Sequence, residues 1–191
     1  HTDVSKSTIE RLTEKAGAAY VAVQTSEVER IECELPTPPL GPAQQFLSVD
    51  GAMVPVVGGE RAEVRTLVIG DVLPPQQVKG EQIVRTANHS YFSRMLDANT
   101  FERLALVETQ RRGVETAQAV AAVTDGAEWI QKFIDHHRFD AVRILDFPHA
   151  AEYMSTFAQV LWGANSEEKA NWLHEQLHQL KTSGATPVLT T

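Results

Sequence analysis

The sequence predicts an α/β fold built on a mixed β-sheet, with a helical segment in front of it. Two observations support this. Three segments rich in β-branched residues follow one another over residues 44–92, and helical and strand patterns then alternate up to residue 181. The chain has 191 residues, 42% hydrophobic and 22% charged, enough for one sizeable core but not for two. We therefore expect one globular domain plus an appendage.

Residues 1–40 are expected to form the appendage, a helical segment that ends in a proline-rich linker. Ser7 stands three residues before Glu10, which is the spacing of a capping box, and apolar residues recur at helical intervals as far as Tyr20. In the following stretch, ELPTPPLGPAQQ, prolines remove backbone donors and fix φ. Regular structure must stop there, so we place the start of the core, residues 41–191, at this linker.

The core is expected to open with three strands. The first is QQFLSVDGAMVPVV, residues 44–57, followed by the hairpin turn GGER and the antiparallel partner AEVRTLVIGDV, residues 62–72. A third strand is expected within EQIVRTANHSYF, residues 81–92. We then expect a helix over 97–113, a strand over 117–126, a helix over 127–137, a strand over 141–147, and helices over 149–163 and 166–181.

The tripeptide Asp-Gly-Ala occurs twice, each time after a β-branched apolar run. Asp50 and Asp125 are too far apart in the chain for one local turn to need both. Ligands in open α/β sheets collect at the carboxyl ends of strands, where we place both aspartates. Two adjacent carboxylates repel unless they share a divalent cation such as Mg²⁺ or Mn²⁺, whose natural chemistry is two-metal phosphoryl transfer. In the alternative interpretation, each Asp-Gly merely turns the chain.

Three segments together resemble a known enzyme family: SVDGAMVP, RLALVETQRRGVETAQAVAAVTDGAEWI and AVRILDFPHAAEYM. They are similar to the transposases of bacterial insertion sequences that carry an Asp-Asp-Glu triad on an RNase H-like fold. The resemblance covers roughly residues 44–181 and is most specific in DGAEWI and LDFPHAAEY. It implies an RNase H-like catalytic core in which Asp50 matches the first aspartate of the triad and Asp125 the second.

The resemblance also implies an activity, a cofactor and a partner. The activity is metal-dependent cleavage and transfer of DNA strands at element ends, with water and then a 3′-hydroxyl as nucleophile. The cofactor is a two-ion site of Mg²⁺ or Mn²⁺, whose ions lower the pKa of the nucleophile. The partner is DNA, both element ends and target, and homo-oligomer formation is left open.

The third acid of the triad departs from the family pattern. In the family it usually follows a helical insertion and lies in a Gly-Ser-Gly-rich segment, and no such segment precedes the terminal SGATPVLTT. We therefore expect an incomplete triad and an inactive chain, with Glu152 as the alternative third acid. Asp146 and His149 resemble an Asp-x-x-His feature of related transposases. Asp146 suits a helix cap equally well, and His149 a hydrogen-bonded structural histidine.

Two further functions compete with the transposase. The segment HEQLH, from His174 to His178, matches a zinc metallopeptidase motif. No third ligand follows it, and Leu173, Leu177 and Leu180 make the same segment an amphipathic helix, so we expect exposed, metal-free histidines. The other competitor is a non-enzymatic interaction module or inactive transposase fragment.

The net charge and the cysteine content limit the possible partners and the cellular compartment. A net charge of −8 predicts that this chain alone binds nucleic acid poorly. Its one cysteine, Cys33, fits a reducing cytoplasm, and no run of eighteen apolar residues suggests a membrane span. We therefore expect a cytoplasmic protein without a membrane partner.

Overall fold

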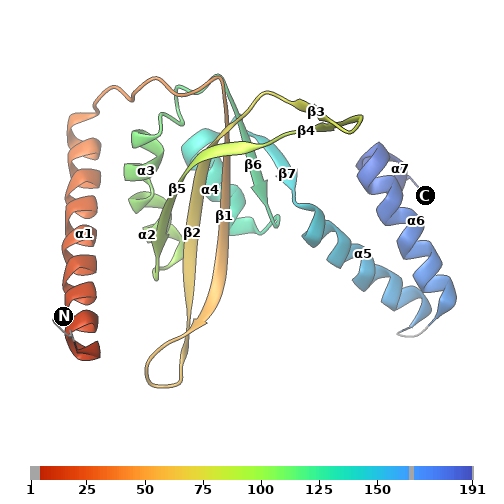
Figure 1. Cartoon of the computed structure of the whole chain (residues 1–191), viewed down its shortest axis with the longest axis horizontal. Coiled ribbons are helices and arrows are strands. Elements are labelled where there is room, and N and C mark those ends of the chain that lie inside the picture. Colours follow the sequence, from red (N-terminus) through yellow and green to blue (C-terminus); the bar gives the residue numbers. More distant parts are fainter. Residues whose placement is uncertain (1–4, 164–165, 191) are drawn as a thin grey trace.

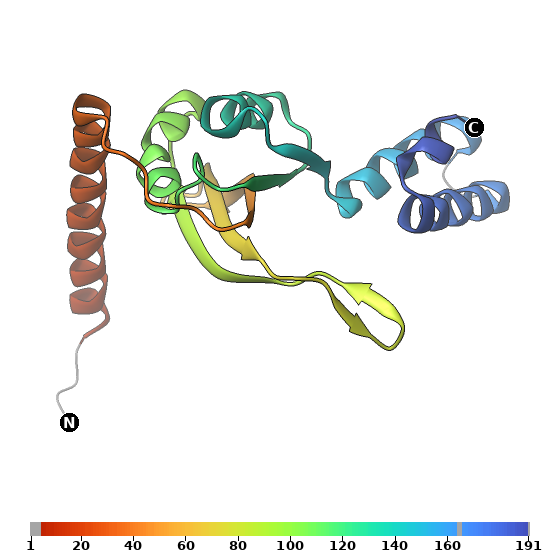
Figure 2. The same ribbon diagram turned by 90° about the horizontal axis from the view of Figure 1, so that it is seen from above.

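The computed structural model describes residues 5–163 and 166–190 and shows a mixed α/β architecture (Figure 1). A five-stranded sheet carries helices on one face, a long N-terminal helix stands beside that helical layer, and a helical arm projects from one sheet edge (Figures 1 and 2). The predicted α/β class with a mixed sheet is confirmed. Among the described helices, none is both long and apolar enough to cross a membrane.

The N-terminal helix α1 (Lys6–Glu34) starts earlier than predicted. Its N-cap is Ser5 and not Ser7, because Ser5 is extended and its side chain accepts a hydrogen bond from the Thr8 amide. The helix ends at Glu34, and the left-handed backbone of its C-cap, Leu35, directs the Leu35 amide to the carbonyl of Ile31. Only its last turns are buried against the body, so the N-terminal half of α1 is exposed.

The main sheet has the strand order β5-β2-β1-β6-β7. Its strands are β1 (Gln44–Pro55), β2 (Arg61–Val72), β5 (Thr86–Arg94), β6 (Ala119–Thr124) and β7 (Val142–Leu145). β2 pairs antiparallel with both β1 and β5, whereas β6 runs parallel to β1 and β7 parallel to β6. The antiparallel strands β5, β2 and β1 are therefore joined, through β1, to the parallel strands β6 and β7.

The predicted third strand over 81–92 is two strands in the structure. The chain leaves the main sheet after β2 and forms a small hairpin of β3 (Gln76–Val78) and β4 (Glu81–Ile83) before it returns as β5. Pro74 and Pro75 cannot donate backbone hydrogen bonds, which favours departure from the sheet. Lys79 and Gly80 both have positive φ, as a tight hairpin turn requires.

The helical layer consists of α2 (Ala98–Leu104), α3 (Leu106–Arg111) and α4 (Glu128–Arg138). The single helix predicted over 97–113 is thus broken at Ala105, which ends α2 and starts α3. Asp97 caps α2 by accepting hydrogen bonds from the amides of Asn99 and Thr100. Gly113 adopts a φ of +59°, and a Cβ there would lie 2.6 Å from the carbonyl oxygen of Pro39, so the linker packs tightly against this turn.

The core lies between the sheet and this helical layer. Alternate residues of β1 point into it, so Gln45, Leu47 and Val49 are buried while their neighbours face the opposite side of the sheet. Phe101 of α2 packs against Phe92 and Phe133. Each such fully buried side chain contributes about 1.5–3 kcal/mol. The core fixes the strand register on which the candidate site depends.

The C-terminal arm comprises α5 (Phe147–Trp162), α6 (Glu167–Ser183) and α7 (Ala185–Leu189). The first two are the helices predicted there, and α7 was not predicted. Gly184, with a φ of +81°, separates α7 from α6. The arm continues directly from the edge strand β7 and extends away from the sheet (Figures 1 and 2).

Candidate active site at the ends of the parallel strands

The register of β1 and β6 relates the two predicted aspartates. The parallel pairs run from Gln44 opposite Ala119 to Ser48 opposite Val123. β6 ends at Thr124, and the same register continued to the next residue would set Asp50 opposite Asp125 and on the same face. Neighbouring strands lie about 4.8 Å apart, so in this arrangement the two carboxylates would lie close together near the carboxyl ends of the parallel strands.

Asp50 is not at the end of its strand, and the expectation that each Asp-Gly closes a strand is wrong for it. β1 continues through Gly51 to Pro55, because its pairing with β2 persists after β6 has ended. The parallel pairing with β6 itself ends at Ser48, two residues before Asp50. Its side chain is exposed, and Oδ1 accepts a hydrogen bond of 2.7 Å from the Gly51 amide.

Two hydroxyl groups continue the polar row from Asp50 across the sheet. Thr66 of β2 stands opposite Asp50, and Ser93 of β5 stands opposite Thr66, with their hydroxyl oxygens 2.9 Å apart. Reading the sequence alone missed both residues. The sequence does place both residues in strands with alternating polar and apolar residues. It does not show that they align with Asp50, because that depends on the register between the strands.

Asp125 follows β6 directly and is half-buried. Its Oδ1 accepts a hydrogen bond of 2.8 Å from the Ala127 amide, and Gly126 between them has a φ of +87°. This turn leads into α4. The alternative interpretation, in which Asp-Gly turns the chain, therefore holds for Asp125. The turn uses only one carboxylate oxygen, so the other oxygen is left for a chemical role.

Asp146 and His149 lie next to Asp125. The Asp146 amide donates to the carbonyl oxygen of Thr124 at 3.0 Å, which ties the start of α5 to the end of β6. Asp146 is the N-cap of α5, and its Oδ1 accepts from the His149 amide at 2.9 Å and lies 2.7 Å from His149 Nδ1. The capping role and the Asp-His pair therefore coexist in one carboxylate.

The charges of this cluster act on one another. Burial of the Asp146 carboxyl works to raise its pKa, but the hydrogen bonds from His149 and its charge outweigh burial and lower that pKa. The hydrogen bond to Asp146 is the main cause of the raised pKa of His149, and burial opposes it. The charges of Asp146, Asp125 and Glu152 raise it further, so these acidic groups surround one imidazole.

The HEQLH segment, which matches the zinc motif, lies on α6, away from Asp50 and Asp125 (Figure 1). His174 and His178 are exposed there. In the part of the chain that the structure describes, no group of three or more His, Cys, Asp or Glu side chains is placed to hold a metal ion. The Asp50–Asp125 pair therefore offers two carboxylate ligands at most, with water to supply the rest.

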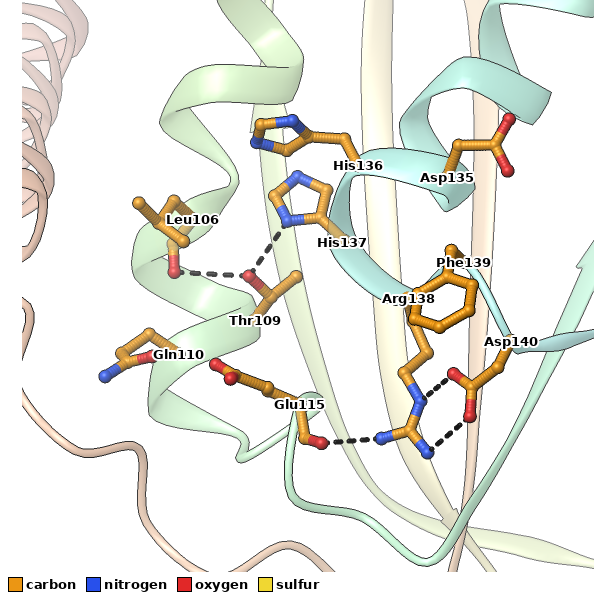
Figure 3. A pocket seen from close by; sticks show the side chains of 10 residues that line it. All are labelled: Leu106, Thr109, Gln110, Glu115, Asp135, His136, His137, Arg138, Phe139 and Asp140. Atoms are coloured by element: carbon orange, nitrogen blue, oxygen red, sulfur yellow. Dashed lines mark hydrogen bonds and ion pairs between the residues drawn. The ribbon is translucent and has the colours of Figure 1, made fainter.

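A pocket of about 410 Å³ lies elsewhere, between α3 and the C-terminal end of α4 (Figure 3). Half-buried His137 in its wall approaches the hydroxyl of buried Thr109 at 3.2 Å and the Glu102 carbonyl at 2.9 Å. Burial lowers the pKa of His137 to about 4, which keeps the ring neutral. Arg138 donates to backbone carbonyls and pairs with Asp140. These hydrogen bonds tie α4 to α2, to α3 and to the segment after α3, which indicates a structural role.

Comparison with models of known protein families gives no match, and comparison with curated proteins finds no relative. The candidate site therefore rests on the residues and their arrangement.

Proposed function

We propose that this chain is the RNase H-like catalytic core of an Asp-Asp-Glu transposase, with Asp50 and Asp125 as metal ligands and DNA as substrate. The observation that carries the proposal is the β1–β6 register, which is formed as far as Ser48 and Val123 and, continued by two residues, would set Asp50 opposite Asp125. The element order supports it too, because three antiparallel strands precede a strand-helix-strand-helix unit, as expected for such a core.

The residues at this edge fit a divalent cation of the Mg²⁺ or Mn²⁺ type. Asp50 and Asp125 supply hard oxygen ligands, and the exposed position of Asp50 leaves room for coordinated water. When bound, such ions supply an activated water and neutralise charge on the transferring phosphate. Without them, the two carboxylates repel each other and also the phosphate backbone.

His149 has a substrate-binding role in this proposal. Asp146 accepts from His149 Nδ1, which fixes the ring and leaves Nε2 free to donate outward. The raised pKa of His149 favours its cationic form, and in that form the ring would offer a positive charge to a DNA phosphate oxygen in a chain that is otherwise acidic. Asp146 acts through His149 and need not touch the substrate.

The first test measures metal binding directly. Titration of Mn²⁺, followed by the electron paramagnetic resonance of the free ion, should reveal a weak site that is lost in Asp50→Asn and in Asp125→Asn. Asp135→Asn is the matched control, because Asp135 lies on α4 and pairs with Arg143. Equal Mn²⁺ binding by all four proteins would overturn the assignment of the two ligands.

The second test measures DNA cleavage. Labelled element-end duplex is incubated at low salt with the 191-residue chain and with a chain extended by a downstream Gly-Ser-Gly-type segment. We expect metal-dependent nicking only by the extended chain, abolished by Asp50→Ala or Asp125→Ala. Nicking by the short chain that Glu152→Gln abolishes would instead identify Glu152 as the third acid.

A further inference from the structure

The C-terminal arm buries too little apolar surface to form a core of its own. Among its described residues, only Ala158 and Gln176 are fully buried. The Gln176 Oε1 atom is buried without a hydrogen-bond partner, so even this small interior is imperfect. Aromatic contacts hold α5 to α6, with Trp172 at 5.3 Å from Trp162 and 5.9 Å from Phe157. Such a helical hairpin gains stability if something covers its open side.

That open side carries an apolar stripe along α5. Tyr153, Phe157, Val160 and Leu161 are exposed by 63%, 55%, 80% and 54%, respectively. Their spacing of i, i+4, i+7 and i+8 places them on one side of the helix. The stripe borders a groove of about 560 Å³ between α5, α6 and α7, whose other walls include Trp172, Val188 and Leu189. Groove and stripe therefore form one continuous apolar surface.

The chemistry of the stripe favours a protein partner. From Tyr153 to Trp162 the sequence contains no charged side chain. A nucleic acid would find no cation there to neutralise its phosphates. A protein surface of the same kind can cover the stripe without burying a charge or meeting like charges.

A second copy of this chain meets those requirements. An antiparallel helical hairpin with one apolar face is half of a four-helix bundle, and a two-fold axis sets the stripe against itself. From their exposed fractions, the four stripe residues together with Leu189 of α7 offer about 600 Å² per copy, roughly three quarters of the contribution of one partner to a standard interface. The arm projects from the sheet edge, so two arms can meet while their sheets stay apart (Figures 1 and 2).

We propose that the chain forms a homodimer in which the α5 stripes of two copies pack together as a four-helix bundle. This inference is independent of the proposed transposase activity, because it uses no residue of the Asp50–Asp125 edge. It assigns the arm a function in assembly and leaves the sheet edges of both copies open to substrate.

The test is the molar mass in solution of the full chain, measured by light scattering after size exclusion and by sedimentation equilibrium. We expect twice the mass of one chain for the wild type and for two controls, Val57→Glu at the β1–β2 turn and Val23→Glu on α1. Both controls replace an exposed valine outside the arm. Val160→Glu should weaken dimerisation by at least about tenfold, because two carboxylates would face each other in an apolar interface. Its helical circular dichroism should stay unchanged.

A cross-link gives an independent readout. With Cys33, the only cysteine, replaced by serine, Val160→Cys should form a disulfide-linked dimer under mild oxidation, whereas Val57→Cys should not. A wild-type chain that remains monomeric at about 100 μM, far above the dissociation constants of specific complexes, would overturn the proposal. So would a dimer that Val23→Glu dissociates and Val160→Glu leaves intact, because that result would locate the interface on α1.

Discussion

Replacing Asp50 by asparagine should stabilise the metal-free protein. If the β1–β6 register continues to Asp50 and Asp125, as the proposed site requires, the two side chains lie about one strand spacing apart, roughly 5 Å. Two unit charges at that distance repel by about 0.8 kcal/mol in water and by about 3 kcal/mol at an effective dielectric constant of 20. Because Asp50 is exposed, the lower end applies, and we expect a gain of about 1 kcal/mol, or about 2–4 °C in Tm.

Asparagine isolates this electrostatic effect. The Oδ1 atoms of Asp50 and Asp125 accept backbone hydrogen bonds from Gly51 and Ala127, and asparagine retains an Oδ1 acceptor. Asp50→Asn, Asp125→Asn and the double variant form a cycle measured by urea unfolding. Either single substitution removes the whole repulsion, so the double variant should gain no more than one of them. The expected coupling energy is about 1 kcal/mol at low salt, and it should vanish at 1 M salt, where the Debye length is about 3 Å.

Magnesium should reverse the ranking. At a concentration about tenfold above its dissociation constant, a bound ion stabilises the wild type by about 1.4 kcal/mol, and the variants lose that gain. A control cycle pairs Asp50→Asn with Asp135→Asn on α4, for which the effects should add. A coupling energy of zero between Asp50 and Asp125 at low salt would refute the adjacency of the two carboxylates, and with it the metal site.

Three further predictions concern the rest of the fold. Burial lowers the pKa of His137 to about 4 from an unfolded value near 6.5, so unfolding between these pH values takes up a proton. The free energy of unfolding should therefore fall as pH drops from about 6.5 to 4. In urea titrations at several pH values, His137→Gln should reduce this pH dependence. His174→Ala should leave the urea midpoint nearly unchanged, and stoichiometric zinc that this variant loses would restore the peptidase interpretation. Gly113→Ala should cost at least about 1 kcal/mol, since φ there is +59° and the linker leaves no room for a Cβ; an unchanged midpoint would contradict the packing of Pro39.

Local patterns determined which elements form. The β-branched runs around Leu47 and Leu67, with Gly58-Gly59 between them, predicted the β1–β2 hairpin, and the helix expected over 127–137 is α4. Where a local signal was ambiguous, boundaries moved. Ser5 and Ser7 are both competent caps, and nothing in the sequence says which backbone is extended.

The sequence by itself also determined the chemistry available: two Asp-Gly pairs, an Asp-x-x-His cap, and an acidic chain with one cysteine. Only the tertiary structure decided which of these groups meet. β6 pairs in parallel with β1 as far as Ser48 and Val123, the Asp146 amide is tied to Thr124, and the α5 stripe is left uncovered. The physical reason is that strand pairing and helix docking depend on contacts between residues far apart in the chain, which the period of a single segment does not encode.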